Sequence, residues 1–98
     1  MMTRSEVIDV LSEHKPELMN RYGVKSLALF GSLGRDQAQT NSDVDVLVEF
    51  GRPTGLFGLF SLQNYLETLL GRAVDLGTLK GLKPRMRERV LAEKVNVI

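Results

Sequence analysis

The sequence predicts a small α/β (α+β) fold in which helices pack against one β-sheet. Two observations support this class. Short apolar runs of strand type are interleaved with longer stretches of helical periodicity, and acidic residues lie on two of the expected strands. Elements that alternate in this way pack as layers of helix and sheet around one core. The order of the strands does not follow from the pattern.

Length and composition narrow the class of protein further. At 98 residues the chain is expected to be one domain, residues 1–98, near the lower end of the size that buries an adequate core. It has no apolar run long enough to span a membrane, no secretory leader at its start and no cysteine, so we expect a cytoplasmic protein without disulfides. A net charge of +1 argues against a protein built to coat nucleic acid, and no direct nucleic-acid partner is expected.

The N-terminal segment predicts two short helices. Thr3–Glu6 has the form of a capping box, so a first helix should start near Arg4. A proline interrupts it, and because proline is tolerated in a first helical turn, a second short helix is expected from about Pro16 to Arg21. Leu18 and Met19 are expected to face the core.

Two apolar runs then predict a pair of strands with a polar loop between them. The first strand is expected at 25–30 and the loop at 33–42. The second run alternates with a period of two, so its residues divide between two faces. One face would carry Asp43, Asp45, Leu47 and Glu49, and the other Val44, Val46, Val48 and Phe50. The second face can pack against a core, while the first can hold an ion.

The C-terminal half predicts a long helix, a third strand and a basic last helix. Apolar positions in 56–70 form a sector about half the circumference wide, which is broader than the usual stripe of about 100°, so part of it could contact a partner. Residues 73–76 read as a short strand. Pro84 suits a first helical turn and opens a helix to about Glu93, and 95–98 could add an edge strand.

The two aspartates of the alternating run suggest a metal site. Asp43 and Asp45 would have Cα atoms about 6–7 Å apart on a strand, so their oxygens could converge on one cation such as Mg²⁺. The alternative is a solvated strand face. Aspartate is disfavoured in strands, however, and two on one face repel each other unless a cation compensates, which favours the metal.

The pair Gly31-Ser32 directly follows the first apolar strand. A glycine there lets backbone N–H groups approach a phosphate closely, and the serine hydroxyl could contribute. The alternative is that Ser32 only caps a helix.

The spacing of these motifs resembles a known family. Gly31-Ser32, ten intervening residues and then Asp43-Val44-Asp45 resemble the signature of the polymerase-β-like nucleotidyltransferases. More narrowly, the chain is similar to the minimal nucleotidyltransferases, the MNT-domain antitoxins encoded beside HEPN-domain toxins. The likeness covers nearly the whole chain and includes Tyr22–Val24, Gly71–Leu76 and the basic stretch Leu82–Arg89. It implies a mixed sheet of the nucleotidyltransferase palm type.

The resemblance also implies roles for individual residues. Asp43, Asp45 and Asp75 match the family's catalytic carboxylates and would bind the metal, with Asp75 taking a proton from the attacking hydroxyl or sharing a second metal. From the residues alone, Asp75 could equally be a strand-end residue that caps a turn at Gly77-Thr78. Gly31, Ser32 and Arg35 would bind the nucleotide. Arg35 suits a phosphate oxygen, although an isolated arginine at this position could also be a solvated surface residue.

The function that the resemblance implies is Mg²⁺-dependent transfer of AMP from ATP to a hydroxyl, a tyrosine of a cognate HEPN ribonuclease toxin. The chain would then be the antitoxin, with ATP and the toxin as partners and an oligomer compatible with their complex. An alternative is a non-catalytic antitoxin that neutralises its partner by binding and occlusion, which the wide apolar helix sector suggests. A small-molecule adenylyltransferase is disfavoured because no extra domain is present to hold such a substrate.

Overall fold

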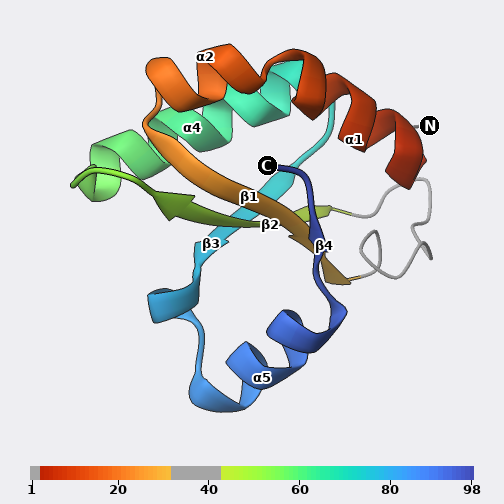
Figure 1. Ribbon diagram of the computed structural model, residues 1–98, viewed down its shortest axis with the longest axis vertical. Helices are drawn as coiled ribbons and strands as arrows, with labels where there is room; N and C mark the ends of the chain where they lie inside the picture. The colour runs from red at the N-terminus through yellow and green to blue at the C-terminus, as the bar shows by residue number, and fades with distance from the viewer. Residues whose placement is uncertain (1–2, 32–42) are drawn as a thin grey trace.

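The computed structural model describes residues 3–31 and 43–98, which form one layer of sheet with helices on both faces (Figure 1). The sheet is mixed and has the strand order β3-β2-β1-β4, with β2 parallel to β3 and β1 antiparallel to both β2 and β4. The predicted α/β class and the mixed sheet implied by the family resemblance are therefore confirmed. The elements are α1 (Arg4–Glu13), α2 (Lys15–Asn20), β1 (Val24–Phe30), β2 (Val44–Phe50), α4 (Gly55–Leu70), β3 (Val74–Thr78), the 3₁₀ turn η1 (Leu79–Gly81), α5 (Pro84–Glu93) and β4 (Val95–Asn96).

One face of the sheet holds the main core. Helices α1, α2 and α4 lie together over this face, at the top of Figure 1. Their buried leucines and Val7 meet the apolar side chains of β1 and β2. The predicted alternation is confirmed, since the valines of β2 are all buried in this core. The strand residues that it buries are Val24, Leu27, Leu29, Val44, Val46, Val48 and Val74.

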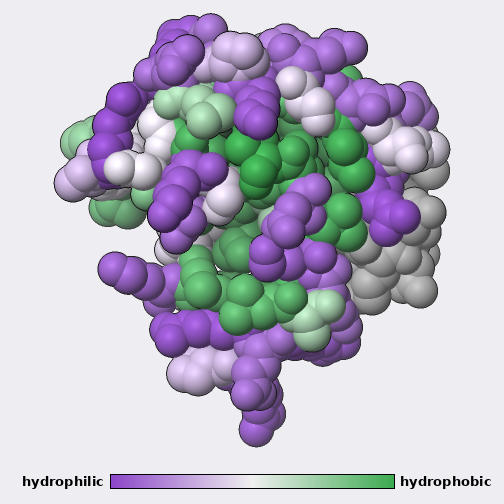
Figure 2. All heavy atoms as spheres, in the orientation of Figure 1, coloured by the Kyte–Doolittle hydropathy of each residue, from purple (hydrophilic) through white to green (hydrophobic). Residues whose placement is uncertain are grey.

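In the described part of the chain, a single helix covers the opposite face of the sheet. Helix α5 lies below the sheet in Figure 1, and its Val90 is buried against Ala28 and Leu47. Phe30 and Leu82 pack around this smaller cluster. Because α5 covers only part of the face, hydrophobic atoms remain visible between the helical layer at the top and the α5 layer at the bottom of Figure 2.

The two N-terminal helices largely agree with the sequence prediction. The Thr3 hydroxyl accepts a hydrogen bond from the Glu6 backbone N–H at 3.2 Å, and the Glu6 carboxylate accepts one from Thr3, which completes the capping box. Leu18 is fully buried as predicted. The prediction for Met19 was wrong, since its side chain is 42% exposed. Successive helical residues are about 100° apart, and a helix as short as α2 has room for only one of the pair on its buried side.

The two edge strands are held in different ways. The predicted edge strand at the C-terminus is confirmed, because β4 pairs with β1 and Val97 N–H continues the contact to the Leu27 carbonyl at 2.8 Å. Strand β3 is held from outside by α4. The Gln63 amide donates to the Val74 carbonyl and the Val74 N–H donates to the Glu67 carboxylate, each at 2.9 Å.

Strand β3 is longer than the sequence indicated. Gly77 and Thr78 belong to the strand, so the alternative in which Asp75 caps a turn there was wrong. The Thr78 hydroxyl instead accepts from the Gly81 N–H and caps η1. No helix among the described residues is long and apolar enough to cross a lipid bilayer.

Candidate active site

Two of the predicted carboxylates lie side by side in the parallel pair β2–β3. The strand register places Asp45 opposite Asp75. Neighbouring strands are about 4.8 Å apart, and residues that are partners in a parallel ladder point to the same face. Their neighbours Val44, Val46 and Val74 are buried in the main core, so both aspartates face the α5 side. Asp45 is half-buried and Asp75 is exposed.

The third aspartate lies at the same end of the sheet. Asp43 is exposed and directly precedes β2, two residues before Asp45. The next residue, Val44, donates its N–H to the Ala73 carbonyl at 2.9 Å, which holds the start of β2 against the start of β3. Both strands therefore begin at the edge that carries the acidic side chains.

The glycine bend after β1 is in contact with this acidic edge. The last residue of β1, Phe30, pairs with Asp45 in the antiparallel ladder, and Gly31 follows with a φ of +66°. A Cβ atom at Gly31 would lie only 2.2 Å from the Asp45 Oδ2 atom. Glycine is therefore required here twice, by its left-handed backbone and by the close approach of the carboxylate.

The donor set suits a hard divalent cation. Like charges directly opposite each other destabilise a strand pair, and a cation between Asp45 and Asp75 would remove that repulsion. No three acidic or histidine side chains in 3–31 and 43–98 come close enough together to hold one ion. Mg²⁺ is usually bound by only one or two carboxylates, with substrate phosphates and water completing its shell, so the carboxylate pair fits this metal.

The structure thus brings together Gly31, Asp45 and Asp75, with Asp43 at the same edge. Ser32 and Arg35 lie outside the described residues. The catalytic, metal-binding and nucleotide-binding roles assigned to these residues from the sequence stay predictions.

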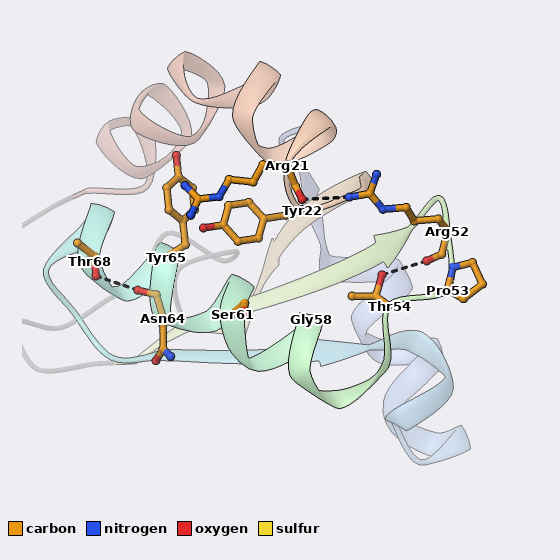
Figure 3. Close-up of a pocket in the computed structure, with 10 residues that line it drawn as sticks. All are labelled: Arg21, Tyr22, Arg52, Pro53, Thr54, Gly58, Ser61, Asn64, Tyr65 and Thr68. Atoms are coloured by element: carbon orange, nitrogen blue, oxygen red, sulfur yellow. Dashed lines mark hydrogen bonds between the residues drawn. The ribbon is translucent and has the colours of Figure 1, made fainter.

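A separate hollow of about 690 Å³ lies on the helical side of the molecule, between α2 and α4 (Figure 3). None of the three aspartates lines it. The rings of Tyr22 and Tyr65 stack there with centroids 4.7 Å apart, and the Arg52 guanidinium donates to the Arg21 carbonyl at 3.0 Å. Burial, and then the charge of Glu17, raises the pKa of Tyr65. These side chains mainly tie the loop after α2 to α4 and to the loop after β2.

Sequence reasoning missed the residues that position Asp75. Gln63 and Glu67 of α4 grip the backbone of Val74, the residue before Asp75, and so help to fix the register of β3. They are spaced i, i+4, so they lie on one side of a helix that is otherwise strongly apolar. A polar pair with this spacing in a mainly apolar helix was the sequence feature that could have identified these two residues.

Comparison with known proteins was made against families, curated sequences and solved structures. A family model described as a nucleotidyltransferase domain matches residues 11–97. The protein adenylyltransferase MntA of Thermococcus cleftensis is 42% identical over 97 residues, which covers 99% of this chain and 98% of that protein.

Two solved structures extend the comparison. A structure described as a minimal nucleotidyltransferase superposes with a TM-score of 0.81 at 37% identity, covering 96% of this chain and 95% of the other. The second is a tri-AMPylated Shewanella oneidensis HEPN toxin in complex with an MNT antitoxin. It matches with a TM-score of 0.66 at 17% identity and covers 93% and 71% of the two chains, so this likeness concerns the fold alone.

Proposed function

We propose an acceptor and a biological role for a chain that belongs to the nucleotidyltransferase domain family, among the MntA-like protein adenylyltransferases. The chain transfers AMP from ATP to a tyrosine hydroxyl of a HEPN-domain ribonuclease toxin. Because this modification neutralises the toxin, the chain acts as its antitoxin. In this proposal residues 1–98 act as one catalytic domain in the cytoplasm. The observation that supports the site most directly is the pair Asp45 and Asp75 in register, with Gly31 against Asp45.

In the proposed reaction, the acceptor oxygen attacks the α-phosphorus of ATP. A new P–O bond forms to the tyrosine, the bond from the α-phosphorus to the β-phosphate bridging oxygen breaks, and pyrophosphate leaves. The acceptor proton passes to the Asp75 carboxylate, which is exposed and can therefore meet a hydroxyl that arrives from another protein. Catalysis is mainly positioning and charge neutralisation, as in other phosphoryl transfers.

Asp45 and Asp75, which lie in register, are the pair that would hold Mg²⁺, with Asp43 at the same edge of the sheet. When bound, the metal would neutralise charge on the phosphate oxygens. The backbone at Gly31, together with Ser32 and Arg35, would bind the triphosphate in this proposal. The absence of a side chain at Gly31 leaves the approach to Asp45 open on that side.

A labelling experiment tests the proposal. The chain is incubated with Mg²⁺, ATP labelled at the α-phosphate and a purified HEPN-domain ribonuclease, and the label is located by mass spectrometry. Label on a tyrosine of that protein, lost in Asp43→Asn and Asp45→Asn, is the expected result. Full activity in both variants would refute the site.

A second candidate function is supported by one observation. Leu56, Phe57 and Phe60 at the start of α4 are 68%, 90% and 54% exposed, which is unusual for such side chains and typical of a protein contact. A non-catalytic antitoxin could use this surface to occlude its partner. Inhibition of the ribonuclease without transfer of label, unchanged in Asp45→Asn, would favour this alternative.

A further inference from the structure

The first turns of α4 border a groove, which we call the α4 groove, and the exposed Leu56 is one of its lining residues. The groove lies on the α5 side of the sheet, has a volume of about 830 Å³, and is bounded by the first turns of α4, by η1 and by α5. The hollow between the helical layer and the α5 layer is visible in Figure 2. Its apolar lining includes Leu47, Phe50, Leu56, Leu59, Leu79 and Leu91. A concave apolar surface of this kind suits the apolar side of a helix or an extended segment.

The charges around the α4 groove are mainly positive. Arg52, Lys80 and Lys94 line it, and Glu49 is the one carboxylate among its lining residues. Glu49 is itself paired with Lys25, with 3.9 Å between the Nζ and Oε1 atoms. A complementary segment would therefore combine apolar side chains for the groove with acidic residues at its borders.

These charges disfavour a second copy of the chain as the occupant. A two-fold contact places the same surface patch on both sides of the interface. Face-to-face pairing through the α4 groove would therefore set its three cations near their own copies. A lipid surface could cover the exposed Phe57 side chain. A bilayer, however, has no peptide segment that could enter the groove.

The α4 groove lies on the same sheet face as the aspartates. Thr78 lines the groove and is three residues along β3 from Asp75, which corresponds to about 10 Å of strand. Glu49 is four residues along β2 from Asp45, or about 13 Å. A few extended residues, each spanning up to about 3.5 Å, would connect a segment in the groove to a tyrosine at the acidic edge.

We propose that the α4 groove is the docking site for an amphipathic, acidic segment of the acceptor protein. This inference rests on the proposed function, since it takes the acceptor to be a protein, and it deepens that function by separating the docking contact from the reacting tyrosine. The groove sets the affinity for the acceptor, while the aspartates carry out the transfer.

The test measures binding without transfer. A purified HEPN-domain ribonuclease is titrated calorimetrically with the chain in the absence of ATP and Mg²⁺. Leu56→Asp and Lys80→Glu should each raise Kd by about tenfold or more, because one removes an exposed apolar side chain that lines the groove and the other reverses a charge at its border. Both side chains are exposed, so circular dichroism should show an unchanged fold.

Two matched variants serve as controls. Met19→Asp places an acid at another exposed apolar position, and Lys15→Glu reverses another exposed lysine. Both positions are on α2, outside the α4 groove, and should leave Kd unchanged. A Kd for Leu56→Asp and Lys80→Glu equal to that of the wild type, or no binding of the acceptor by the wild type, would overturn the proposal.

Further measurements separate this proposal from other occupants and from the proposed function. Loss of self-association in Leu56→Asp, seen by sedimentation equilibrium with acceptor binding unchanged, would assign the groove to a second copy. Loss of co-sedimentation with phosphatidylserine vesicles, again with acceptor binding unchanged, would assign it to lipid. Binding that depends on the groove without any transfer of label would support docking and refute the enzyme reaction. Transfer of label with an unchanged acceptor KM in the groove variants would support the enzyme reaction and refute docking in the groove.

Discussion

The two faces of the sheet divide the work of the molecule. One face is covered by α1, α2 and α4 and buries the valines of β2 completely or nearly so. The other is covered, among the residues that the structure describes, only by α5; it buries Ala28, Leu47 and Val90 and carries both the aspartates and the α4 groove. The same strands supply both faces because successive side chains alternate. A short chain can thus place a stable core and a solvent-accessible carboxylate pair within one strand thickness of each other.

The largest expected effect is a loss of AMP transfer, caused by a substitution on the face that α5 covers. Asp45→Asn should reduce labelling of the acceptor by at least about a hundredfold, because it removes a carboxylate that would hold the cation against the nucleotide phosphates. The free energy of unfolding should be equal or higher, since the repulsion from Asp75 is relieved. Radiolabel transfer and urea denaturation measure the two quantities. Asp9→Asn on the exposed side of α1 is the control, and an equal loss of activity in both variants would contradict the site.

Substitutions on the face that α1, α2 and α4 cover should mainly lower the stability of the protein. Leu29→Ala should lower the free energy of unfolding by about 3 kcal/mol, because a fully buried leucine leaves a cavity in the main core. Leu47→Ala on the other face should cost less, since one side of Leu47 borders the α4 groove and is not enclosed by packing. Urea denaturation of both variants gives the comparison. Equal losses would mean that the two faces are equally well packed.

A pair of glycine variants tests the bend at the acidic edge. Gly31→Ala and Gly71→Ala both place a side chain on left-handed backbone, with φ of +66° and +64°, so each should cost about 1–2 kcal/mol of stability. Only the new Cβ at Gly31 would strike the Asp45 carboxylate, since nothing lies within 4 Å of one at Gly71. Transfer should therefore fall by about tenfold or more in Gly31→Ala alone. Similar activity in the two variants would refute the importance of this contact.

The smallest expected effect concerns the helix that covers the second face. Helix α5 begins after Lys83, whose backbone has the extended geometry of an N-cap but whose side chain makes no capping hydrogen bond. Lys83→Ser should stabilise the protein by about 0.5–1 kcal/mol by accepting a bond from the first turn. Thermal denaturation measures the change, and Ser5→Ala, inside α1, is the control position. A lower melting temperature would indicate that Lys83 has another structural role.

The helices and strands, and the face of β2 that is buried, could be predicted from the sequence. The register between strands that are far apart in the chain could not. The alternation in β2 predicted which side chains are buried, and the capping box and Pro84 predicted where α1 and α5 begin. The pairing of Asp45 with Asp75 joins strands separated by the whole of α4, and no local pattern determines it. The family resemblance implied only that Asp75 lies beside the other two aspartates. Ser32 and Arg35, which rest on the same resemblance, lie outside the described residues.

Local patterns also failed where tertiary contacts decide the outcome. Met19 is as apolar as Leu18, yet the sheet offers space for only one of them. Gly77 has the residue type of a turn, but the ladder with β2 extends the strand through it to Thr78. Turn propensity is a weak preference that a neighbouring strand can override.

The two hydrogen bonds between α4 and Val74 fix the register of β3 as well as its place at the edge of the sheet. A strand that slips by one residue turns every side chain to the opposite face. For β3, such a slip would send Asp75 into the main core and bring Val74 and Leu76 to the acidic edge. Gln63 and Glu67 oppose that slip from outside the site. A screen for inactive variants should therefore recover substitutions on a distant helix, in proteins that still fold and yet present the wrong side chain to the nucleotide.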